Sequence, residues 1–138
     1  MEQLAVEIVG LCREYGECRV EVERMEEARR VKNALESVCA MARQRLDISD
    51  PALLLALLDA CEVTRDEGML QEVLDVVGRN LDRLAVSAES VKLLACCCYY
   101  VEEEECVERA GRMLEELRKM GRGEEELADV ETILEELT

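Results

Sequence analysis

Apolar residues recur at every third or fourth position along most of this chain, which is the spacing of one face of an α-helix. The longest such stripe, within residues 20–46, runs from Val22 through Met25 and Val31 to Leu46. No stretch alternates apolar and polar residues as a strand would, and no hairpin signal is present. We therefore expect an all-α protein of about seven helices, over residues 2–15, 20–46, 51–64, 67–84, 88–101, 106–120 and 124–137.

Two of these segments are much more apolar than the rest. Residues 91–101 contain a single charged side chain, Lys92, in a chain where 36% of residues are charged. Residues 53–63 are similarly apolar. A helix that is apolar on nearly every side is normally covered by its neighbours. We expect these two helices to form the centre of the protein.

Capping residues mark several helix ends. Asp50 is a good N-cap and Pro51 suits the first helical position. Asp66 and Ser87 are the expected caps of the fourth and fifth helices. Gly16 is expected to end the first helix.

The two central segments belong to an internal repeat. A shift of 37 residues places Leu57 on Leu94, Cys61 on Cys98 and so on through the helix that follows. Each unit is a more apolar helix, a short polar turn and an amphipathic helix. A period in the thirties is typical of arrays of helical hairpins.

Residues 107–121 resemble the second helix of a pentatricopeptide unit, and residues 51–121 resemble the tetratricopeptide and pentatricopeptide superfamily of α-solenoids. The resemblance implies stacked antiparallel hairpins whose first helices line a concave ligand-binding face. A compact antiparallel bundle of about seven helices fits the same periodicity. On the solenoid reading, the single domain 1–138 comprises hairpins 2–46, 51–84 and 88–120 and a capping helix 124–137.

Charge and composition disfavour several classes of function. The net charge is −16, which disfavours binding to nucleic acid and to anionic membranes. No signal peptide and no membrane-spanning stretch is recognisable, so a soluble, cytoplasmic protein is expected. Abundant Glu with scarce Asn and Gln fits a thermophilic source, although a GC-rich genome would also favour much of this composition.

The chain offers little catalytic chemistry. It has no histidine, which removes every mechanism that uses imidazole as a base or ligand. No glycine-rich phosphate loop follows a strand, and no C-x-x-C pair indicates zinc. We expect no enzymatic activity, no cofactor and no metal.

The eight cysteines allow two interpretations. In a reducing cytosol they would be buried thiols. Alternatively, Cys12 with Cys18, and Cys98 with Cys106, bracket predicted turns and would close short disulfide loops.

Two surface features are candidates for binding. The first joins a tyrosine pair to an acidic run, and comprises Tyr99, Tyr100, Glu102, Glu103, Glu104 and Glu105. Such a pair either anchors an interface or plugs the end of the core with its hydroxyls pointing outward. The second is a basic patch that either docks an acidic partner or pairs with acidic neighbours, and comprises Arg29, Arg30, Lys32, Arg43 and Arg45.

These features support three hypotheses of function. The first is a non-enzymatic helical-repeat adaptor that binds a protein partner, with a basic partner favoured by the charge. The second is an acidic inhibitor or nucleic-acid mimic that occupies a basic groove. The third is a small structural subunit of a larger assembly that self-associates through the 20–46 helix.

Overall fold

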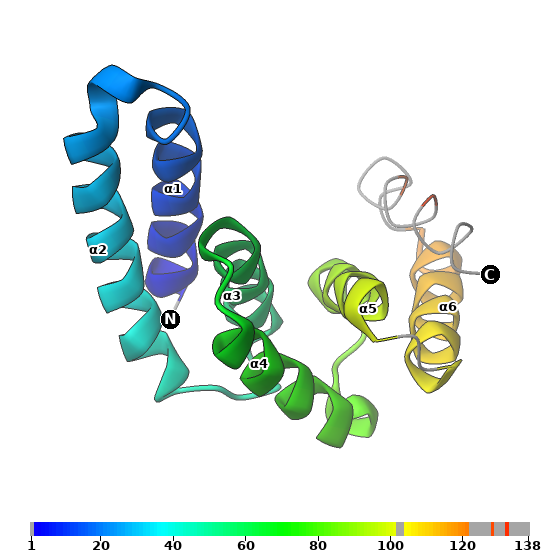
Figure 1. The fold of residues 1–138 in the computed structure, drawn as a ribbon. Coiled ribbons are helices and arrows are strands. Elements are labelled where there is room, and N and C mark those ends of the chain that lie inside the picture. Colours follow the sequence, from blue (N-terminus) through cyan, green and yellow to red (C-terminus); the bar gives the residue numbers. More distant parts are fainter. Residues whose placement is uncertain (1, 102–103, 122–127, 129–131, 133–138) are drawn as a thin grey trace.

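The fold is entirely helical across the part of the chain that the structure describes (Figure 1). This computed structural model describes residues 2–101, 104–121, 128 and 132. The elements are α1 (Glu2–Cys18), the 3-10 turn η1 (Val22–Arg24), α2 (Met25–Arg43), α3 (Pro51–Thr64), α4 (Glu67–Arg79), the 3-10 turn η2 (Leu81–Arg83), α5 (Ala88–Tyr100) and α6 (Glu104–Lys119).

The all-α class is therefore confirmed, with six α-helices in the described ranges. The expected capping helix, 124–137, lies almost wholly outside the described residues. The arrangement of the chain as three hairpins with a cap thus stays an interpretation.

Three predicted helix caps are present. The Asp50 Oδ1 atom accepts a hydrogen bond from the Leu53 amide at 3.2 Å, and Pro51 opens α3. The Asp66 Oδ1 atom accepts from the Met69 amide at 3.0 Å. The Ser87 hydroxyl accepts from the Ser90 amide at 3.1 Å. Each cap satisfies an amide that the helix itself leaves unpaired, and is worth about 1 kcal/mol.

Some helix ends differ from the prediction. Gly16 does not end α1, which continues to Cys18, a buried side chain beside Glu27 of α2. The expected 20–46 helix begins as η1 and ends at Arg43.

The fourth helix also stops before its predicted end. It ends at Arg79, where the Asn80 side-chain amide donates to the Val76 carbonyl at 2.7 Å. That local bond offers a backbone carbonyl an alternative to continued helix. Leu84 still reaches the core, from just beyond η2.

Helix packing is organised around α3. It contacts α1, α2, α4 and α5, while α1 also packs on α2, and α5 on α6. Figure 1 shows α1 and α2 side by side and antiparallel, and places α1, α3 and α5 in one row. The packing explains why α3 and α5 can be so apolar, since they have neighbours on several sides.

The core confirms the predicted centre of the protein. A single hydrophobic cluster contains fully buried side chains from both apolar helices, namely Leu53, Leu54, Leu57, Leu93 and Leu94. The exposed side chains of these two helices are Asp59, Glu62, Glu89, Tyr99 and Tyr100. Burying one leucine side chain contributes about 1.5–3 kcal/mol, so these leucines stabilise the fold most.

We predict that Leu57→Ala lowers the free energy of unfolding by about 2–5 kcal/mol, because a buried leucine leaves a cavity when truncated. Urea unfolding followed by circular dichroism measures this. The control is Val22→Ala, a side chain that is 83% exposed, for which a change within about 0.5 kcal/mol is expected. Equal effects of the two substitutions would contradict this packing.

Candidate interaction surface

An open groove runs along the row of helices α1, α3 and α5. Its volume is about 370 Å³, and most of its lining is contributed by apolar side chains of α1 and α3. Val6 is 71% exposed there, an unusual position for a large apolar side chain. The lining comprises Ala5, Val6, Val9, Gly10, Arg13, Ala52, Leu55, Ala56, Asp59 and Glu89.

Carboxylates extend this groove along α3 toward the end of α5. Asp59 lies in the groove, and Glu62 follows one helical turn later. Burial raises the pKa of the Asp59 carboxyl, and the nearby Glu62 carboxylate raises it further. The two acids thus repel each other on one helix face, and a cation bound between them would relieve that repulsion.

Tyr100 lies beside this acidic pair. Partial burial raises the pKa of its hydroxyl, with further contributions from Glu62, Cys96 and Asp59. The hydroxyl therefore stays protonated at neutral pH and can donate or accept a hydrogen bond. The structure thus places the predicted Tyr100 near two carboxylates of α3. The sequence analysis did not single out these two residues, Asp59 and Glu62.

The structure describes four of the six residues of the predicted tyrosine and glutamate surface. Tyr99 is 65% exposed and Tyr100 is 44% exposed, so both side chains reach solvent. Glu104 and Glu105 are exposed in the first turn of α6. Glu102 and Glu103 lie outside the described residues.

The sequence does contain a pattern that predicts an exposed acidic face on α3. Asp59 and Glu62 are the only charged residues within the apolar segment 53–63, and they stand three positions apart. That spacing places both on one face of a helix. In a helix otherwise covered by neighbours, this face has to be the one open to solvent.

The predicted basic patch divides into two parts. Arg29, Arg30 and Arg45 are exposed and Lys32 is half-buried. Arg43 is instead committed to an internal contact with α4, so it is removed from the predicted docking patch. The sequence interpretation in which these cations pair with acidic neighbours applies to Arg43.

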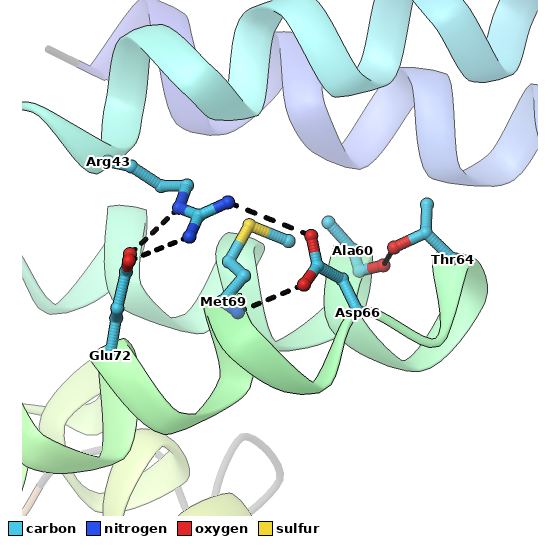
Figure 2. Close-up of polar contacts among 6 residues, drawn as sticks. All are labelled: Arg43, Ala60, Thr64, Asp66, Met69 and Glu72. Atoms are coloured by element: carbon cyan, nitrogen blue, oxygen red, sulfur yellow. Dashed lines mark hydrogen bonds and ion pairs between the residues drawn. The ribbon is translucent and has the colours of Figure 1, made fainter.

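Figure 2 shows how Arg43 ties α2 to α4. Its Nε and Nη2 atoms donate to the two carboxylate oxygens of Glu72 at 2.8 and 2.7 Å. Its Nη1 atom lies 3.7 Å from an oxygen of Asp66, the residue that caps α4. The paired guanidinium lowers the pKa of the Glu72 carboxyl below its ordinary value. This bidentate geometry makes the ion pair specific in orientation, and among the described residues Arg24 and Glu27 form a second bidentate pair.

All eight cysteines lie in the described ranges and carry thiols. Cys12 and Cys18 both belong to α1, six residues apart. Six residues of helix span about 9 Å, beyond the separation of about 7 Å that a disulfide can bridge. The predicted Cys12–Cys18 bridge is therefore wrong, because the helix does not end at Gly16.

The second predicted pair is close in space. The Cys98 and Cys106 side chains are hydrogen-bonded to each other, and this contact together with burial raises the pKa of Cys98. A disulfide between them stays a prediction. Among the described residues, no group of cysteine and acidic side chains is arranged to hold a metal ion.

Burial keeps the other thiols protonated. It raises the pKa of Cys12 and Cys39 to about 11 and that of Cys61 to about 12. A thiolate is the reactive form of cysteine, so these three side chains act as small apolar groups in the core.

Comparisons with known proteins give no relative for this chain. No family model matches it, and no curated protein or solved structure shows significant similarity. Within the ranges that the structure describes, no helix is both long and apolar enough to cross a lipid bilayer. The function must therefore be inferred from the surface itself.

We predict that Glu72→Gln lowers the free energy of unfolding by about 0.5–1 kcal/mol at neutral pH, a modest value because the pair is partly exposed. The folded-state pKa of Glu72 is depressed, so the stabilisation is present above its unfolded pKa and is lost as pH falls through the folded pKa. Urea unfolding of both proteins at neutral and at acidic pH should show the difference shrinking on acidification.

The matched control for this ion pair is Glu36→Gln, since Glu36 is exposed on α2 and forms no ion pair with a described residue. Its stability should differ little from that of the parent protein at either pH. If Glu72→Gln lowers the free energy of unfolding no more than Glu36→Gln does, the ion pair between Glu72 and Arg43 contributes nothing to stability.

We also predict that the folded protein resists alkylation at seven of its eight cysteines, because only Cys96 is partly exposed. Iodoacetamide labelling read by mass spectrometry should give one slow adduct in the folded state and eight after denaturation under reducing conditions. Cys96→Ser should abolish the folded-state adduct. Rapid labelling of several thiols without denaturant would disprove the buried arrangement.

Proposed function

We propose that this chain is a non-catalytic helical-repeat adaptor that binds a protein segment on the row formed by α1, α3 and α5. In this interpretation α1 and α2, α3 and α4, and α5 and α6 are three hairpins, and the first helix of each lines the binding face. The observation that carries the proposal is the groove of about 370 Å³ along that row, which is lined mostly by apolar residues and also bears Arg13, Asp59 and Glu89.

The groove favours a segment with both apolar and basic side chains. Val6, Val9 and Leu55 offer apolar contact area that water now covers. Asp59, Glu62 and Glu89 offer negative charge. The net charge of −16 adds long-range attraction for a basic partner and accelerates its association.

Tyr99 and Tyr100 would supply the rigid part of the interface. Tyrosine has few rotatable bonds and combines an apolar ring with a polar tip, so it is frequent among residues that dominate binding energy. Tyr100 lies beside Glu62, so a segment that extends along α3 from the groove would reach it.

A catalytic role has less support. The chain lacks histidine, and burial keeps the thiols of Cys12, Cys39 and Cys61 protonated, so none of these three is an activated nucleophile. The nucleic-acid mimic hypothesis requires carboxylates on one continuous face. Exposed acidic side chains instead occur on all six described α-helices, with Glu7, Glu26, Asp59, Glu67, Glu89 and Glu104 as examples.

The test is a fluorescence-polarisation screen of synthetic peptides sorted by charge and apolar content. We expect binders to combine Arg or Lys with Leu, Ile or Val, and to weaken as salt is added. Asp59→Asn with Glu62→Gln should weaken them by about tenfold or more. Tyr99→Ala with Tyr100→Ala should do the same.

The matched control is Glu36→Gln with Glu115→Gln, which removes the same two charges from exposed positions on α2 and α6. Affinity should then fall only slightly, through the change in net charge. Equal losses in the groove and control variants would show that binding is nonspecific. A screen without any basic binder would refute the proposed partner class.

A further inference from the structure

A second cleft lies between the end of α4 and the first part of α6. Its volume is about 390 Å³, and it shares no lining residue with the groove described above. Its walls come from the last turn of α4, from η2 and from the first half of α6. The lining comprises Gly78, Arg79, Leu81, Asp82, Glu105, Glu108, Arg109 and Arg112.

Three arginines converge on this cleft from two helices. Arg79 belongs to α4, while Arg109 and Arg112 belong to α6. None of them forms an ion pair with a described residue. This contrasts with Arg43, which pairs with two carboxylates, in a chain that carries 33 acidic residues.

Arg109 indicates that the missing partner of this cleft is an anion. It is half-buried, and its Nη2 atom donates to the Leu84 carbonyl at 3.3 Å, which holds the guanidinium in place. Its Nε atom is buried and has no hydrogen-bond partner in the described structure. Arginine stays charged in proteins, and a buried charge without a counter-ion is unfavourable. The acids of the cleft, Asp82, Glu105 and Glu108, are exposed and can be solvated by water.

We propose that this cleft binds a small oxyanion, a carboxylate or phosphate group with at least two oxygens available to the arginines. Guanidinium groups recognise both kinds of group through paired N–H···O bonds. The cleft has the size of ordinary small-molecule sites. A neighbouring hollow of about 290 Å³ shares Gly78 and Arg79 and is lined by Leu74, Cys97 and Val101 among others, so it could take an apolar part of the ligand.

Gly78 keeps the α4 wall of the cleft open. A Cβ atom built on it meets nothing within 4 Å. A longer side chain there would enter the cleft without disturbing the helix. Gly78→Gln therefore blocks the site and leaves all of its charges in place.

The experiment is isothermal titration calorimetry of the full chain with inorganic pyrophosphate and, separately, with citrate. We expect at least one probe to bind with a dissociation constant of about 1 mM or tighter. The stronger probe indicates whether the natural ligand carries phosphate or carboxylate. Arg79→Gln with Arg112→Gln should weaken binding by about tenfold or more, and Gly78→Gln should also weaken it.

Two controls separate a built site from general electrostatics. Arg29→Gln with Arg30→Gln removes the same charge from the exposed face of α2 and should leave the affinity nearly unchanged. Glu105→Gln with Glu108→Gln removes repulsion inside the cleft and should strengthen binding. Thermal melts confirm that each variant is folded.

The outcome that overturns the proposal is equally definite. It fails if neither probe binds at concentrations up to about 10 mM. It also fails if the α2 arginine variant loses as much affinity as the cleft arginine variant. It fails as well if the Gly78→Gln protein has the melting temperature of the parent protein and binds both probes with the parent's affinity.

Discussion

The structure depends on the burial of two apolar helices, α3 and α5. All of their leucines except Leu55 are buried, and the two helices cannot be covered by a single partner helix because they are apolar on nearly every side. The other helices are amphipathic, and their apolar faces meet this centre. Burial of apolar surface is the dominant favourable term in folding, so the positions of α1, α2, α4 and α6 follow from the need to cover α3 and α5.

This constraint also decides where function can reside. In a helix with neighbours on several sides, the face without a neighbour stands out, and in α3 it bears Asp59 and Glu62. The apolar groove of α1 and α3 adjoins that face, and Tyr100 of α5 lies beside Glu62. The proposed binding surface is thus the part of the central row that the outer helices leave uncovered.

The scarce cations have unequal roles in a chain of net charge −16. Arg43 joins α2 to α4 through Glu72 and Asp66. Arg24 is similarly paired with Glu27 at 2.9 Å, close to the turn between α1 and α2. The arginines of the α4–α6 cleft have no such partner in the described structure. Unpaired cations in so acidic a protein are more informative than its many exposed acids, which solvation alone explains.

The sequence by itself determined the class of the fold, the caps Asp50, Asp66 and Ser87, and the burial of the two apolar segments. These are local properties, set by helical periodicity and by hydrogen bonds between residues three positions apart. Only the tertiary structure decided that α1 passes Gly16 and reaches Cys18, whose buried side chain is hydrogen-bonded to Glu27 of α2. It likewise decided that Arg43 pairs with Glu72, and that the Glu62 carboxylate lies near enough to Tyr100 to raise the pKa of its hydroxyl. Those pairs are 29 and 38 residues apart in the chain, where periodicity carries no information and packing alone brings the residues near each other.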